Sequence, residues 1–125
     1  MSVIQKLWDA EENKDIDQWN EVLSDDFVWV KHSTGEHVGK EQLGKWFMSE
    51  EAPKPENSRI IYENNEIGVG HSFVTFKDGS RQAVLVVYTI KGGKITRSES
   101  PEIKITFITI NTIAIIVSEL LLITL

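Results

Sequence analysis

The sequence predicts an α+β domain in which three N-terminal helices pack on a curved, mainly antiparallel sheet. Two observations support this fold class. Apolar residues recur at helical spacing in three segments of the first 50 residues, and after residue 57 the apolar period changes from 3.6 to 2. Short turn sequences separate the later apolar runs, as expected for hairpins. A chain of 125 residues is long enough to bury a core of its own.

The first two helices are predicted from capping signatures. Ser2 with Gln5, and Asp15 with Gln18, each place a hydrogen-bond acceptor three residues before a glutamine, the pattern of a helix start. Apolar residues follow each signature at helical spacing. Two acidic residues of the first helix are expected to face water, namely Glu11 and Glu12.

A strand and a third helix are predicted next. The β-branched and aromatic run that begins at Phe27 predicts a strand to about His32. Residues 33–39 contain two glycines and are predicted as a loop. The third helix is expected to begin near Lys40 and to present one apolar face, formed by Leu43, Trp46 and Phe47.

The second half of the chain is predicted to be a set of antiparallel strands. Residues 52–57 contain two prolines and are predicted as a linker. Asp78-Gly79 and Gly92-Gly93 are typical of hairpin turns. Gly68 and Gly70 predict bulges within their strand. The expected strands are Ser58–Glu63, Ile67–Phe76, Arg81–Ile90 and Ile95–Ser100.

Composition excludes several classes of function. Without cysteine the chain has no disulfide framework and no thiolate chemistry. A formal net charge of −6 is the wrong sign for a general nucleic-acid binder. Charge occurs early and no apolar signal segment precedes it, so a cytoplasmic location is expected. No metal is predicted, because His32, Glu36 and His37 lack the spacing of a ligand set.

Three short motifs resemble the nuclear transport factor 2-like superfamily, in its SnoaL-like and ketosteroid isomerase-like branch. They are residues 23–30, 39–43 and 91–95, and the resemblance covers about residues 3–102. It implies a cone-shaped fold enclosing an apolar pocket and needing no cofactor. Isomerases, cyclases, dehydratases and non-catalytic binding modules share this scaffold, so the resemblance indicates a fold better than an activity.

The resemblance places the general base of the isomerase branch at Lys31, where a carboxylate is expected. Lysine could act as a base or form a Schiff base, or it is simply a solvated charge. The strand expected to carry an acidic oxyanion donor contains no acid but includes Tyr88, a hydrogen-bond donor or a packed ring. His71 could serve as an acid or base, or as a structural histidine. The catalytic candidates are therefore Lys31, His71 and Tyr88.

Tryptophans are the candidate ligand-binding residues. Trp8 and Trp46 lie on apolar helix stripes, which is also the pattern of core residues. Trp29 alternates with Phe27 and Lys31 on one face of a strand. In a cone fold the rings of Trp8, Trp29 and Trp46 could stack on a flat apolar ligand, with Lys31 near the mouth of the pocket.

Two functions follow as hypotheses. The first is a small domain that binds an apolar small molecule and performs cofactor-free acid–base chemistry of the isomerase, cyclase or dehydratase type. The second is a non-catalytic ligand-binding or dimerisation module of the same fold. A homodimer is expected in either case, because relatives pair through the sheet and residues 81–90 are apolar on both faces.

The last 23 residues differ from the rest. Residues 103–125 are strongly apolar, and only Lys104 and Glu119 are charged. They could be a membrane anchor, an added strand or a terminus foreign to the domain. A membrane is a partner only in the first case. We expect residues 1–102 to form the domain and to fold without this segment, since Pro101 should interrupt the sheet.

Overall fold

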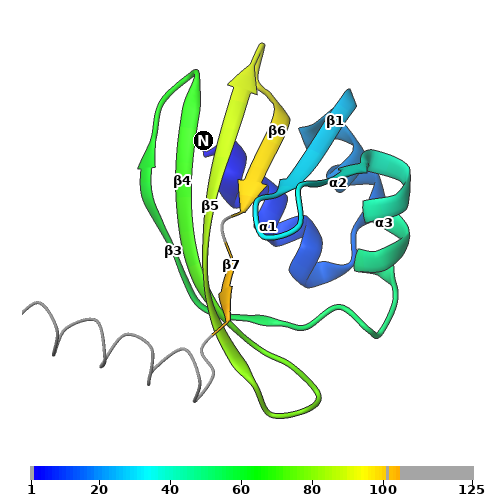
Figure 1. Cartoon of the computed structure of the whole chain (residues 1–125). Coiled ribbons are helices and arrows are strands. Elements are labelled where there is room, and N and C mark those ends of the chain that lie inside the picture. The colour runs from blue at the N-terminus through cyan, green and yellow to red at the C-terminus, as the bar shows by residue number, and fades with distance from the viewer. Residues whose placement is uncertain (1, 101, 105–125) are drawn as a thin grey trace, which may run out of the picture.

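The computed structural model describes residues 2–100 and 102–104, and its helices lie on one side of a curved sheet (Figure 1). This confirms the predicted α+β fold class with three helices in the first half of the chain. The helices are α1 (Val3–Asn13), α2 (Ile16–Val22) and α3 (Lys40–Met48). The strands are β1 (Leu23–Lys31), β2 (Glu36–Gly39), β3 (Pro55–Glu63), β4 (Ile67–Thr75), β5 (Arg81–Lys91), β6 (Lys94–Ser100) and β7 (Glu102–Lys104).

The sheet has the order β2-β1-β6-β5-β4-β3, and β7 pairs with β5. The β1–β6 pair is parallel and the other described pairs are antiparallel. The parallel pair joins the N-terminal segment to the hairpins, because β1 leaves α2 directly and lies beside the last long strand. Both predicted caps form, since Ser2 accepts from the amide of Gln5 and Asp15 from that of Gln18.

Three segments differ from the sequence prediction. Residues 36–39, predicted as a loop, form β2, because Gly35 adopts a left-handed conformation and turns the chain back onto β1. Pro55, predicted in a linker, begins the edge strand β3, where a missing amide is tolerated. The β4–β5 ladder runs without a register shift at the predicted bulges Gly68 and Gly70, whereas the β3–β4 ladder shifts its register opposite Gly70.

The two glycines also allow close packing. A Cβ atom on Gly68 would overlap Cδ1 of Ile4, and one on Gly70 would lie 2.6 Å from Cζ2 of Trp8. Glycine therefore lets α1 approach the sheet. Because side chains alternate along a strand, these contacts also define which face of the sheet meets the helices.

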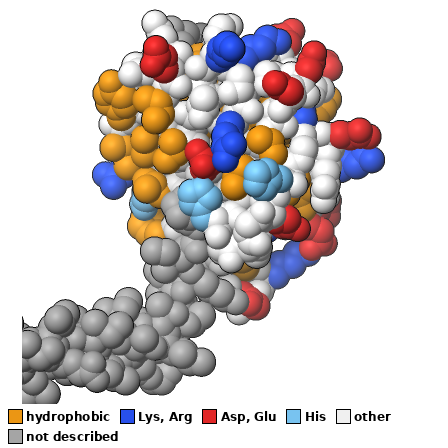
Figure 2. Space-filling view, turned by 45° about the horizontal axis from the view of Figure 1, so that its top comes forward, with side chains coloured by type: hydrophobic (Ala, Val, Ile, Leu, Met, Phe, Trp, Pro, Cys, Tyr) orange, Lys and Arg blue, Asp and Glu red, His pale blue; other side chains and the backbone are white. Residues whose placement is uncertain are grey.

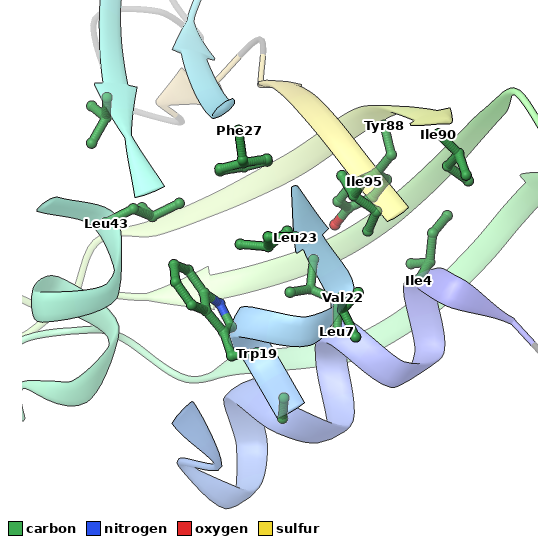
Figure 3. Packing of buried hydrophobic residues seen from close by; sticks show 12 residues of the cluster. Ile4, Leu7, Trp19, Val22, Leu23, Phe27, Leu43, Tyr88, Ile90 and Ile95 are labelled. Carbon is green, nitrogen blue, oxygen red and sulfur yellow. The ribbon is translucent and has the colours of Figure 1, made fainter. Parts of the chain in front are cut away.

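We call the helix-facing side the concave face, and its residues include Gly68, Gly70, Val86, Tyr88, Ser98 and Trp29. The opposite side is the outer face, which carries Val69, His71, Phe73, Leu85, Val87, Arg97 and Glu99. The core lies between the concave face and the helices, where Trp19 of α2 and Tyr88 of β5 point into one cluster (Figure 3).

The last described strand extends past the predicted domain boundary. β7 pairs with β5 through Glu102 opposite Val84 and keeps the register in which Glu99 of β6 lies opposite Val87. Strand β6 ends at Ser100, as predicted, and the described sheet gains a further short strand, β7, beyond it. The three interpretations of the C-terminal segment concern residues 103–125, of which residues 105–125 lie outside the described residues. Within residues 2–100 and 102–104, no helix combines the length and apolar character needed to span a membrane.

Candidate functional site

A hydrogen bond joins two of the predicted site residues inside the fold. Nε1 of Trp8, on α1, donates to Oη of Tyr88, on β5, over 3.0 Å. Gly70 on the neighbouring strand makes room for the indole ring. Tyr88 is only 5% exposed, and it forms part of the core cluster. The structure therefore holds the Tyr88 phenol against the helix layer on the concave face.

Glu11 is an ionisable group of this interior that sequence reasoning placed in water. The prediction was wrong for Glu11, which is partly buried, and right for Glu12, which is exposed. Burial raises the pKa of Glu11 to about 8, opposed by the indole N–H of Trp19 and by the charge of Lys14. The Trp19 Nε1 atom is buried without full hydrogen-bond geometry to any acceptor in the described residues.

The helical spacing contains the signal for Glu11. Trp8 lies three residues before it and Leu7 four residues before it, so Glu11 continues the face that packs on the sheet. The prediction gave more weight to the charge of the Glu11 side chain than to its spacing from Leu7 and Trp8. Burial and the neighbouring charge of Glu11 raise the pKa of Tyr88 well above its ordinary value, while the Trp8 hydrogen bond lowers it.

A second aromatic group lies where β1 meets α3. The rings of Trp29 and Trp46 stack with centroids 6.1 Å apart and an interplanar angle of 23°. Nζ of Lys31 lies 5.2 Å from the Trp29 ring and forms an ion pair of 3.6 Å with Glu36 of β2. Trp46 remains 38% exposed. This group is an aromatic surface with a cation at one edge.

His71 lies away from these two groups. It projects from the outer face of β4, because its neighbour Gly70 packs on Trp8 and side chains alternate. Its ring contacts Phe73 edge-on at 4.9 Å, and Nδ1 is buried without a hydrogen-bond partner in the described residues. The structure thus brings Tyr88 together with Trp8 and separates both from His71.

The clefts of the described surface lie away from the predicted residues. Two surface clefts have volumes of about 620 Å³ and 480 Å³, one beside the start of α1 and one beside the start of α3. Their walls contain none of the six candidate residues. Among residues 2–100 and 102–104, no group of three histidine or acidic side chains is arranged to hold a metal ion.

Comparisons with known proteins agree with this architecture. Residues 4–98 match the SnoaL-like domain family, and the chain belongs to that family. This confirms the resemblance inferred from the sequence motifs. No curated protein matches the chain.

Solved structures show the same fold at low sequence identity. A nuclear transport factor 2-like protein of unknown function from Burkholderia xenovorans has a TM-score of 0.66 and 18% identity, over 83% of this chain and 82% of that one. A protein from Sphaerobacter thermophilus has a TM-score of 0.69 and 10% identity, over 82% and 94%. A ketosteroid isomerase-like fold from Catenulispora acidiphila, in complex with trimethylamine, has a TM-score of 0.57 and 17% identity, over 79% and 83%.

Proposed function

We propose that this SnoaL-like domain binds a small apolar molecule against its concave face and performs cofactor-free acid–base chemistry on it. One observation carries the proposal: Trp8 and Trp29 are only partly buried on the helix-facing side of the sheet, and Trp46, which stacks on Trp29, is exposed. Trp8, Trp29 and Trp46 together offer flat apolar surface, and Tyr88 offers a hydroxyl. Small-molecule sites characteristically combine apolar walls with a few placed polar groups.

The roles of the residues follow from their positions. Trp29 and Trp46 would stack on the ligand, Trp8 would fix the phenol, and Tyr88 would donate to a polar atom of the ligand. Lys31 would stay at the rim, because its ammonium already pairs with Glu36 and is partly exposed. His71 has no part in this site, since it lies on the outer face. A cytoplasmic location is retained as part of this proposal.

The binding surface can be tested with two neutral bicyclic probes, tetralin and 1-tetralone. We expect both to quench tryptophan fluorescence and to raise the melting temperature of the full-length protein. Trp46→Ala should weaken binding at least roughly tenfold, because it removes an exposed aromatic wall. The matched control is Ile16→Ala, which trims a side chain of equal exposure on α2. Unchanged affinity in Trp46→Ala would exclude the aromatic surface as the site.

The alternative, a non-catalytic dimerisation module, is favoured by the outer face. Large apolar side chains are exposed there, including Leu85 at 37% and Tyr62 opposite Val69. Arg97 and Glu99 lie beside them and interact at 3.4 Å. Figure 2 shows hydrophobic, basic, acidic and histidine side chains side by side on the surface. We propose that a second copy of the chain covers this face, since a patch with both charges can pair with itself about a twofold axis.

Sedimentation of the full-length protein over a range of concentrations tests the dimer. We expect Leu85→Asp to shift the protein from dimer to monomer, whereas Ile16→Asp, on a helix away from the outer face, leaves the dimer intact. Equal association of both variants would show that copies do not meet through this face.

A further inference from the structure

We propose that His71 makes the association of two copies through the outer face sensitive to pH, so that the dimer dissociates when His71 is protonated. This inference rests on the proposed dimer and names its regulation. All three histidines of the chain lie on the outer face. His32 contacts Glu99, and His37 lies opposite Val30, whose neighbour on β6 is Glu99. Histidine is the side chain that ordinarily changes charge between about pH 5 and 8.

His71 lies in the apolar part of the outer face with one ring nitrogen enclosed. Its ring contacts Phe73 edge-on at 4.9 Å, and the residue opposite it on β5 is Leu85. The Nδ1 atom is buried and has no hydrogen-bond partner within residues 2–100 and 102–104. This surrounding favours the neutral ring with a bare Nδ1, because protonation would place an N–H there with nothing to accept it.

The charges beside His71 also disfavour its protonation. On β3, the residue opposite His71 is Arg59. A second cation comes from β5, where the guanidinium of Arg81 stacks over the Phe73 ring at 4.3 Å. Like charges on opposite residues of a ladder destabilise each other. A proton on His71 would therefore add positive charge to a region that is already positive.

The carboxylates in the neighbouring rows of the sheet already have cationic partners. In the row on one side, Glu99 lies 3.3 Å from His32 and 3.4 Å from Arg97. In the row on the other side, Glu56 lies 4.0 Å from Arg81. A second copy related by a twofold axis presents the same groups, so it brings no additional free carboxylate from these rows. The titratable and charged side chains of the three rows, with those that contact them, are Arg59, Glu56, Tyr62, Arg81, Arg97, Glu99, His32 and His37.

Covering the outer face turns this local preference into a pH-dependent association. In a single copy the His71 side chain is half-buried, so water can hydrate a positive charge on its exposed edge. In the dimer the second copy displaces that water and adds its own cations to the interface. A buried charge without a partner is costly. The protonated form therefore favours single copies, and a lower pH shifts the equilibrium toward them.

The net charge of the chain predicts the opposite response. The formal net charge is −6 at pH 7, so two copies repel each other. Acidification brings this charge closer to zero, and the weaker repulsion favours association. Dissociation at low pH would therefore come from the outer face rather than from the net charge. Unfolding would not imitate it, because the pKa of Glu11, raised by burial to about 8, favours the folded state at low pH.

Sedimentation equilibrium of the full-length protein at pH 8 and pH 5.5, at one ionic strength, tests the inference. We expect the dimer dissociation constant to increase about 100-fold at pH 5.5, or roughly tenfold for each of the two His71 side chains. His71→Gln and His71→Phe are uncharged at both pH values, so their dissociation constants should change little. The matched control is His37→Gln, which removes a more exposed histidine of the same face and should keep most of the pH dependence.

Two outcomes separate this inference from the proposed dimer. If the wild type dimerises equally well at both pH values, or if the His71 variants dissociate at pH 5.5 as the wild type does, the role of His71 is overturned and the dimer stands. If the wild type sediments as a monomer at pH 8 over the whole concentration range, the proposed dimer fails and His71 loses its role with it.

Discussion

Val87 and Tyr88 are adjacent on β5, yet they belong to two different surfaces of the same sheet. On the concave face, Tyr88 is buried and accepts a hydrogen bond from Trp8 of α1. On the outer face, Val87 lies opposite Val69 and Glu99 without a covering layer in the described residues. Because side chains alternate along β5, the buried Tyr88 hydroxyl and the apolar patch around Val87 lie on opposite faces of the sheet. The two proposals therefore use opposite faces of one strand, ligand binding the concave face and association the outer face.

The largest expected effect concerns the interior carboxyl and the pH dependence of stability. The pKa of Glu11 is raised from 4.5 to about 8 on folding, so the protonated form is favoured in the folded state. Its stabilising contribution is complete below pH 4.5 and is lost as the pH rises to about 8. The difference between the two pKa values limits the resulting loss of unfolding free energy to roughly 5 kcal/mol. Because Glu11 keeps some contact with solvent, we expect about 3 to 4 kcal/mol.

Urea unfolding at several pH values measures this effect. Glu11→Gln should unfold at higher urea than the wild type above pH 8 and should lose the difference near pH 4.5. Glu12→Gln, on the solvent side of the same helix, should follow the wild type throughout. If the free energies of unfolding of the wild type and Glu11→Gln depend on pH in the same way, the Glu11 carboxyl is hydrated in the folded protein.

The tryptophan on β1 gives the next largest effect. Trp29 projects from the concave face, packs against the core and stacks on Trp46. Trp29→Ala should lower the free energy of unfolding by about 3 kcal/mol, the lower end for such a change because the ring is partly exposed. Thr89→Ala, an exposed outer-face substitution, is the control and should change it by less than about 0.5 kcal/mol. If Trp29→Ala is as stable as the wild type, the Trp29 side chain does not pack against the core.

Local signals predicted much of the fold, whereas contacts between distant segments decided the rest. Capping residues and hairpin turns act within a few residues, so Ser2, Asp15 and the later strands could be located from the sequence. The strand β2 was missed because its partner β1 and the burial of Val38 stabilise it, rather than its own propensity.

The candidate site shows the same division. Tyr88 and Trp8 could be selected by residue type, but their hydrogen bond joins positions 80 residues apart. His71 lies on the outer face because of the register of its strand. A shift of one residue would have turned its side chain toward the interior. Glu11 was missed because its partial burial depends on α2, whose Trp19 lies beside its carboxyl. Sequence patterns therefore identified chemical types, and tertiary contacts assigned them to a face.

A glycine on the concave face gives a smaller effect. Gly70→Ala would place a methyl group 2.6 Å from the Trp8 ring, so the indole must move and its hydrogen bond to Tyr88 must lengthen. We expect a loss of about 2 kcal/mol, as for other overpacked cores. Gly39→Ser is the control, because nothing lies within 4 Å of a Cβ atom there. Equal melting temperatures for the two variants would contradict close packing of α1 on the sheet.

The smallest expected effect lies at the rim where β1 and β2 form a hairpin. The Lys31–Glu36 ion pair is 3.6 Å long and partly exposed, and pairs of this kind contribute about 0.5 kcal/mol or less. A double-mutant cycle with Lys31→Met and Glu36→Gln should yield a coupling energy in this range that decreases in 0.5 M salt. Because the pair is weak, breaking it should change the stability of the β1–β2 hairpin very little. A coupling above about 2 kcal/mol would instead make Lys31 a fixed structural residue. The aromatic surface formed by Trp29 and Trp46 would then have to bind its ligand without help from the ammonium group.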